Sequence, residues 1–301
     1  MYDDKIKQAK QQYQNNNLKA AIDLYEEAFQ EKILLDDLMD LGLLYYEAKD
    51  FRKAREAFEA IISFNPRYAR AYYGLAIIAE EFNDFEEAIR LYKTALSYDE
   101  KFDSAYFNIA GIYDEAGEDE KALKYYKKTL LVNASHFWAH VNLGSLYERN
   151  GYDDLALEHT LTAYKINPNA SKVCFNLGVI YAKLKQYDLA VKFYKEELTK
   201  KDPYQVTYLN LGLLYKDIYK DFNQARLYYL EGIKKDKNDY NLWFNLGCLY
   251  ALENNFDDAY DCLLYAYILK PKLRKDILTD PELEEFRQTE KFNKLNEIIA
   301  G

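Results

Sequence analysis

Residues 137–170 read FWAHVNLGSLYERNGYDDLALEHTLTAYKINPNA, and the pattern of this stretch decides the fold. Apolar residues recur at helical spacing on both sides of Asn150-Gly151, a dipeptide that is typical of a turn. The pair Asp153-Asp154 stands at the expected start of the second helix, where the helix dipole favours negative charge. Pro168 then ends the helical pattern. The stretch therefore predicts a hairpin of two helices, helix A followed by helix B.

The hairpin pattern recurs along the chain with a period of 34 residues, which two series of small residues show. The series in helix A is Gly42, Ala76, Ala110, Gly144, Gly178, Gly212 and Gly247, and the series in helix B is Ala54, Ala88, Ala122, Ala156, Ala190, Ala225 and Ala259. Both series lengthen by one residue between Gly212 and Ala225. A period of this length indicates stacked hairpins, because one hairpin cannot bury its apolar face without neighbours.

Each copy has the same residue types at fixed positions, counted from its first residue. The matching residues are Leu41, Gly42, Tyr45, Ala54, Phe58 and Pro66 in one copy, Leu143, Gly144, Tyr147, Ala156, Ala163 and Pro168 in another, and Leu246, Gly247, Tyr250, Ala259, Ala266 and Pro271 in a third. This pattern resembles the tetratricopeptide repeat (TPR) family. The resemblance implies an all-α fold, a right-handed superhelical solenoid of stacked helix hairpins, in which helices A line a concave groove.

The repeats predict how the chain is divided. We expect a TPR solenoid over 1–273, with copies at about 2–34, 35–68, 69–102, 103–136, 137–170, 171–204, 205–239 and 240–273. The first copy has a polar helix A, as an N-terminal cap requires. For 274–301 we expect two short amphipathic capping helices, one of which begins at Asp280-Pro281-Glu282.

The composition restricts the partners. The net charge is −10, which opposes general binding to nucleic acid or to an anionic membrane, so we expect neither as a partner. Cys174, Cys248 and Cys262 are odd in number and far apart, which favours a reducing compartment. The first residues lack the apolar stretch of a signal peptide, and a cytoplasmic location is the expectation.

The sequence predicts no enzyme, no cofactor and no metal site. His136 and His140 are four residues apart but straddle two copies, and no zinc-protease motif accompanies them. A glycine-rich phosphate loop and a nucleophile with its base are also missing from the sequence. Cys248 is expected on the groove side of its helix, where one thiol without a base is not a nucleophile by default.

Helix A has two faces when its residues are placed at about 100° each. Positions 4, 7, 8 and 11 form the packing face, and positions 2, 5, 6, 9, 12 and 13 form the opposite face, which we call the A-face. Position 6 holds a series of asparagines: Asn108, Asn142, Asn176, Asn210 and Asn245. Asn in a helix interior costs roughly 0.5 kcal/mol relative to Ala, so the series is notable.

The asparagine series has two interpretations. A carboxamide offers a donor and an acceptor, so one such group in each repeat could hold the backbone of an extended peptide. Such a series looks like the asparagine ladder in the TPR domain of O-linked N-acetylglucosamine transferase. Alternatively, the asparagines are inherited by repeat duplication, or they bond a neighbouring helix.

Aromatic and acidic residues of the A-face are further candidates for peptide contact. The aromatic candidates are Tyr73, Phe107, Trp138, Phe175 and Phe244, and the acidic candidates are Glu80, Glu81, Asp114 and Glu115. The acidic group predicts preference for a basic peptide. The alternatives are aromatic side chains half-buried between helices and an acidic face that is merely solvated.

The sequence therefore predicts a non-enzymatic scaffold for protein–protein interaction. Its partner is expected to be a protein or peptide that lies in the groove, and a basic peptide is one option. Two alternatives stay open: a structural module that self-associates, and a regulatory sensor whose peptide ligand changes the pitch of the superhelix.

Overall fold

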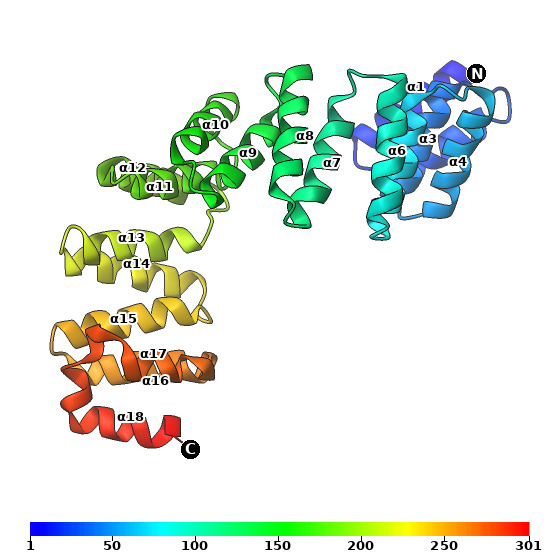
Figure 1. The fold of residues 1–301 in the computed structure, drawn as a ribbon. Coiled ribbons are helices and arrows are strands. Elements are labelled where there is room, and N and C mark those ends of the chain that lie inside the picture. Colours follow the sequence, from blue (N-terminus) through cyan, green and yellow to red (C-terminus); the bar gives the residue numbers. More distant parts are fainter. Residues whose placement is uncertain (301) are drawn as a thin grey trace. The chain divides into compact units, whose positions relative to one another are not determined.

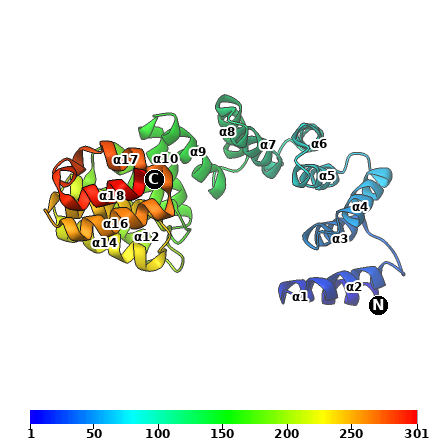
Figure 2. The same ribbon diagram turned by 90° about the horizontal axis from the view of Figure 1, so that it is seen from below.

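The computed structural model describes residues 1–300, and these residues are helical apart from short connections (Figures 1 and 2). The chain divides into two compact units, unit 1 from Met1 to Leu146 and unit 2 from Tyr147 onward. The helices before the division are α1 (Tyr2–Gln14), α2 (Leu18–Ala28), α3 (Leu35–Glu47), α4 (Phe51–Phe64), α5 (Ala69–Glu81), α6 (Phe85–Tyr98), α7 (Asp103–Glu115) and α8 (Asp119–Val132). They are followed by α9 (Phe137–Arg149).

Unit 2 continues the alternation of A and B helices. Its helices are α10 (Asp153–Ile166), α11 (Val173–Lys183), α12 (Tyr187–Leu198), α13 (Val206–Asp217), α14 (Phe222–Lys235), α15 (Tyr240–Leu252) and α16 (Phe256–Leu269). Within each unit, an A helix packs on the B helix that follows it, and that B helix packs on the next A helix. The chain is thus built from stacked helix pairs, which confirms the predicted all-helical repeat architecture.

Close approach between helices explains the two small-residue series. Ala54, Ala88 and Ala122 of the B helices are fully buried. At Gly42, an added Cβ would lie 2.5 Å from Cε1 of Phe58, and at Gly74 it would lie 2.6 Å from two atoms of the same ring. One aromatic ring of helix α4 therefore fills the space that two glycines leave on neighbouring A helices, at the density of a protein interior.

The turns between helices A and B locate the extra residue of the repeat. In the regular copies, one residue such as Lys49 or Asn83 adopts a positive φ, and the next N–H bonds to a carbonyl five residues earlier. This hydrogen bond is typical of an α-helix that ends with one residue in the left-handed (αL) conformation. After α13 the corresponding bond runs from Asp221 to Tyr215, six residues earlier. The insertion therefore lies in this turn, which is one residue wider than the others.

The segment that begins at Pro271 contains two short α-helices and three 3₁₀ turns in residues 271–300. It comprises η1 (Pro271–Leu273), α17 (Arg274–Thr279), η2 (Pro281–Leu283), η3 (Phe286–Gln288) and α18 (Glu290–Ala300), where η marks a 3₁₀ turn. The Asp280-Pro281-Glu282 sequence starts a 3₁₀ turn rather than an α-helix, with the Asp280 carboxylate accepting from the N–H of Glu282. Leu283 and Phe286 are fully buried against the core of α15 and α16.

An ion pair between a buried lysine and a half-buried glutamate fastens this segment to unit 2. The Nζ atom of Lys216 in α13 lies 2.5 and 2.6 Å from the two carboxylate oxygens of Glu282 and 3.4 Å from Asp217. Lys216 is only 4% exposed. Burial by itself would lower the pKa of Lys216, but the bond to Glu282 and the charges of Glu282 and Asp217 raise that pKa above 10.5. The lysine therefore stays charged in the core.

Among residues 1–300, none of the helices combines the length and the hydrophobicity that crossing a bilayer requires.

We predict that Gly42→Ala destabilises the protein by about 1–3 kcal/mol, because the added methyl group overlaps the Phe58 ring. Urea unfolding monitored by circular dichroism measures this change. Gly111→Ala is the matched control on another A helix of unit 1: its Cβ meets nothing within 4 Å, so it should gain up to about 1 kcal/mol. Equal stability of the two variants would contradict the close-approach explanation.

We also predict that Glu282→Gln lowers the stability of unit 2 by about 3 kcal/mol, since it leaves the ammonium of Lys216 buried without its main partner. Hydrogen exchange of the 271–300 segment and of α13 measures the loss. Replacing both partners, with Lys216→Met and Glu282→Leu, should restore most of the protection. A single variant as well protected as the double variant would show that the pair is not buried as described.

Candidate functional site

The asparagines of the A-face bond to tyrosines of the preceding helix B. Nδ2 of Asn142 donates to the hydroxyl of Tyr126 at 2.9 Å, and Nδ2 of Asn210 donates to Tyr194 at 3.1 Å. The same atom of Asn108 donates to Tyr92 at 2.7 Å, and it also lies 3.3 Å from the hydroxyl of Tyr73. In all three pairs the tyrosine at position 24 precedes the asparagine by 16 residues. Each pair thus ties two successive repeats together.

The other repeats vary at these two positions. Where position 24 is Phe58, which has no hydroxyl, the residue 16 positions later is Gly74. In the first copy the partner is an acid, and the hydroxyl of Tyr25 lies 3.4 Å from Asp40. The residue 16 positions before Asn176 is Thr160, whose hydroxyl donates to a carbonyl of its own helix at 2.7 Å.

Asn245 departs from the rule although its tyrosine is present. Its Nδ2 donates to the carbonyl of Asn241 at 2.9 Å, within the same helix. The hydroxyl of Tyr229 is buried and has no hydrogen-bond partner among the described residues. The Asn–Tyr bond is therefore one of two geometries that these side chains adopt, and the second leaves a buried hydroxyl without a bond.

The tyrosine link uses the N–H side of the carboxamide. Within the described residues, the Oδ1 atoms of Asn108, Asn142 and Asn210 accept no hydrogen bond. All three side chains are half-buried, so solvent reaches them. An oxygen held in place by a bonded Nδ2 is a pre-positioned acceptor for a peptide N–H. The structural bond that we considered as an alternative is therefore present, and it leaves the acceptor side of each carboxamide unused.

Acidic groups extend this network in unit 1. The hydroxyl of Tyr92 donates to Oε2 of Glu80 at 2.7 Å, and the hydroxyl of Tyr126 lies 3.3 Å from Oδ2 of Asp114. Burial raises the pKa of Glu80; its bond with Tyr92 lowers it, and the nearby charges of Glu115 and Glu81 raise it, with a net shift upward. The surroundings of Glu80 therefore disfavour its ionised form.

A hollow of about 440 Å³ opens beside Glu80, and we call it the acidic hollow. Residues from α3, α5, α6 and α7 and from the turn after α5 line it: Tyr46, Ile77, Glu80, Glu81, Asn83, Phe85, Asn108 and Glu115. It brings together four of the residues that the sequence predicted for peptide binding, namely Glu80, Glu81, Asn108 and Glu115. Asp114 is not among its lining residues.

The acids of this hollow differ in their partners. Glu81 is paired with Lys49 at 2.6 Å, and this bond lowers the pKa of Glu81. Neither Glu80 nor Glu115 forms an ion pair with any cation of the described chain. Glu115 is exposed and Glu80 is half-buried. The acidic hollow therefore holds two carboxylates without a counter-charge.

Most of the predicted aromatic residues fill space between helices. Tyr73 lies between the rings of Tyr92 and Phe102, with centroids 5.4 and 4.8 Å away. Phe107 is flanked in the same way by Tyr126 and His136. Phe175 is flanked by Tyr194 and Tyr204. Phe244 packs on the core of the last repeat. Trp138 is the exception, since it is 55% exposed.

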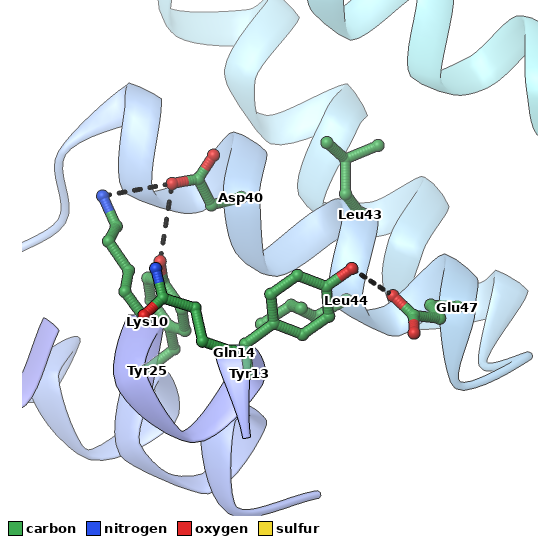
Figure 3. Close-up of a pocket in the computed structure, with 8 residues that line it drawn as sticks. All are labelled: Lys10, Tyr13, Gln14, Tyr25, Asp40, Leu43, Leu44 and Glu47. Carbon is green, nitrogen blue, oxygen red and sulfur yellow. Dashed lines mark hydrogen bonds and ion pairs between the residues drawn. The ribbon is translucent and has the colours of Figure 1, made fainter. Parts of the chain in front are cut away.

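A second hollow, which the sequence did not predict, lies at the first three helices (Figure 3). We call it the N-terminal hollow; it measures about 450 Å³ and is lined by Lys10, Tyr13, Gln14, Tyr25, Asp40, Leu43, Leu44 and Glu47. The polar sequence of the first helix predicts an N-terminal cap and gives no sign of this hollow. The tyrosine at position 24 of the first copy and the acid at position 6 of the second were the available signal.

The C-terminal segment corrects the prediction for Cys248. We expected this thiol on the open side of its helix, but it is 1% exposed, and burial raises its pKa well above 9.0. The sulfur lies with the carboxylates of Asp280 and Glu282 in a group within 4.8 Å. The ammonium of Lys216 already supplies the positive charge for Glu282, so the group needs no metal ion.

Family models described as Tetratricopeptide repeat match this chain at residues 39–100, 79–143, 171–196 and 228–261. No significantly similar sequence was found among curated proteins. These matches fall in both units and include the acidic hollow.

Solved structures show the same fold. The chain resembles the structure of pilF of Pseudomonas aeruginosa, with a TM-score of 0.60 and 19% identity over 69% of this chain and 94% of that one. It also resembles a chain of the APC/C hetero-tetramer Cut9-Hcn1, with a TM-score of 0.59 and 18% identity over 87% of this chain and 53% of that one. A tetratricopeptide repeat protein from Parabacteroides merdae matches with a TM-score of 0.53 and 16% identity, over 81% of this chain and 97% of that one.

We predict an interaction energy of about 1 kcal/mol between Tyr194 and Asn210 in a double-mutant cycle of Tyr194→Phe and Asn210→Ala. The free energy of unfolding of the four proteins measures it. The cycle of Tyr229→Phe and Asn245→Ala is the matched control, because that pair has the same spacing but Asn245 bonds Asn241. Strict additivity at Tyr194 and Asn210 would contradict the proposed link between repeats.

Proposed function

Because this chain belongs to the tetratricopeptide repeat family, we propose that it is a protein-interaction scaffold whose unit 1 holds a basic peptide segment on its A-face. TPR proteins generally bind other proteins, and this supports binding rather than catalysis as the function. The peptide, its basic character and the residues that contact it are our proposal.

The acidic hollow carries the proposal. Glu80 and Glu115 share one depression and lack a cation of the chain, whereas Glu81 beside them is already paired with Lys49. Bringing like charges together is unfavourable, and burial of Glu80 adds to that cost. A Lys or Arg side chain of a partner would relieve both. The planar guanidinium of Arg fits best, because it can donate to two carboxylate oxygens at once.

The asparagines would hold the backbone of the same segment. Asn108 lines the acidic hollow, and Asn142 stands one repeat further along unit 1. Their tyrosine partners fix the Nδ2 side, so that each Oδ1 can accept from a peptide N–H without further ordering. Backbone contacts of this kind would contribute affinity, and the acids would contribute the preference for charge.

We expect Glu80→Gln with Glu115→Gln to weaken the binding of an Arg-rich peptide about tenfold, since each loses a charge-assisted hydrogen bond. The probe is a fluorescein-labelled 12-residue peptide of Ser and Gly with two adjacent Arg, and fluorescence anisotropy gives its Kd. The matched control is Glu59→Gln with Glu100→Gln, which removes the same charge from exposed sites outside the hollow.

The control separates specific binding from general attraction to an acidic protein. If both double variants weaken binding equally, the acidic hollow is not the site. If neither does, the proposed function is wrong for this face. Sedimentation velocity on the same samples tests self-association, which has its own support in Phe64, 75% exposed on α4, and Leu131, 85% exposed on α8.

We predict that the affinity for a basic peptide decreases as the pH is lowered. A bound cation stabilises the ionised form of Glu80 and lowers its raised pKa, so binding releases a proton when the free carboxyl is protonated. Affinity should therefore be highest above the pKa of Glu80 and should fall as the pH decreases through it. The same anisotropy titration between pH 7 and pH 4 measures this fall, which should be smaller in Glu80→Gln.

A further inference from the structure

We infer that the N-terminal hollow is a second subsite for the same partner and takes one bulky, uncharged apolar side chain. The inference rests on the proposed function, because it assigns a further feature to the peptide that would occupy the acidic hollow. The partner is then a segment with a basic residue and an apolar anchor a few residues away.

Lys10 gives the N-terminal hollow a cation of its own, and Glu47 accepts a tyrosine hydrogen bond without an ion pair among the described residues. Nζ of Lys10 lies 3.3 Å from Asp40 and 3.4 Å from Asp37. The hydroxyl of Tyr13 donates to Glu47 at 2.8 Å, and the hydroxyl of Tyr25 lies 3.4 Å from Asp40 (Figure 3). The ammonium of Lys10 would repel an Arg or Lys side chain of a ligand, whereas no cation is among the residues that line the acidic hollow.

Apart from the amide of Gln14, apolar surface fills the rest of the lining. Leu43 and Leu44 come from α3, and the rings of Tyr13 and Tyr25 come from α1 and α2 (Figure 3). The hollow measures about 450 Å³, which lies within the range of about 300–1,000 Å³ found for ligand pockets. A Trp, Phe or Leu side chain fits this volume and would gain from burial there. A neutral side chain also leaves the ion pair of Lys10 and Asp40 intact.

The two hollows share helix α3. Leu43, Leu44 and Glu47 of α3 line the N-terminal hollow, and Tyr46 of the same helix lines the acidic hollow. Helices α3 and α5 contact each other, and packed helices lie about 8–10 Å apart. An extended peptide advances about 3.3 Å per residue, so one repeat corresponds to about three residues. We therefore expect the anchor about three to six residues from the basic residue.

The test compares two labelled 12-residue peptides of Ser and Gly. Both carry two adjacent Arg, and one also carries Trp four residues from them, where the other has Ser. Wild-type protein should bind the Trp peptide about tenfold more tightly, as expected for burial of one large side chain. Leu43→Gln should reduce this ratio to about one and leave the Kd of the Ser peptide unchanged. Leu43→Met, which keeps the apolar surface, should retain the preference.

A second variant covers the case in which Leu43→Gln does not fold. Tyr13 is 45% exposed at the rim, so Tyr13→Ser should leave the helix pairs intact and still lower the ratio. Photo-crosslinking locates the anchor directly: a peptide with benzoylphenylalanine at the Trp position should label residues within 10–47. Equal binding of the two peptides, a preference that survives both variants, or labelling outside this range would overturn the inference.

Failure of the proposed function gives a different result. Glu80→Gln with Glu115→Gln should weaken both peptides equally and preserve the Trp preference. If that double variant changes neither affinity while Leu43→Gln still removes the preference, the acidic hollow is wrong and the apolar subsite stands.

Discussion

The aromatic ring at position 24 of most B helices is the constraint on which the rest of the repeat depends. It projects from helix B against helix A of its own repeat and against helix A of the next, so the residues it meets must yield space. Phe58 requires Gly42 on one side and Gly74 on the other. Where the ring is a tyrosine, its hydroxyl adds a polar requirement, which an asparagine or aspartate on the next helix satisfies except at Tyr229. One side chain thereby sets both the spacing of the helices and the chemistry of the A-face.

The period alone was sufficient to predict the fold, because small residues at a step of 34 leave few alternatives to stacked hairpins. The TPR family and the all-helical repeat architecture are confirmed. The C-terminal segment was less predictable, since its helical pattern competes with tertiary contacts. Asp280 caps a short 3₁₀ turn there, and the carboxylate of Glu282 is drawn to Lys216. The contact of Glu282 with Lys216 has no signal in local sequence, because the lysine is 66 residues away.

The sequence predicted several of the residues of the candidate site, but not the hydrogen bonds and ion pairs that they form. The sequence singled out Asn108, Glu80 and Glu115, and the structure places them around one hollow. It gave no reason to separate Glu81 from them, because the cation of Glu81 comes from Lys49 in the turn of the preceding repeat. The tyrosine partners could have been found by comparing positions 24 and 6 across copies, since a residue without a hydroxyl at Phe58 coincides with glycine. Whether the asparagines bind a peptide stays a prediction.

The ion pair of Lys216 and Glu282 affects how the chain unfolds from its C-terminus. A repeat array loses structure most readily from its ends, where the last unit has a neighbour on one side only. Here the final helix pair lies in the sequence between Lys216 and Glu282, and the ion pair of these two residues closes a loop around it. Helix α18 follows Glu282 and can detach first, but opening the last repeat from the C-terminus must then separate the buried Lys216 from Glu282. Traction applied at that end, as by a degradation machine, would therefore meet its main resistance before the first repeat opens.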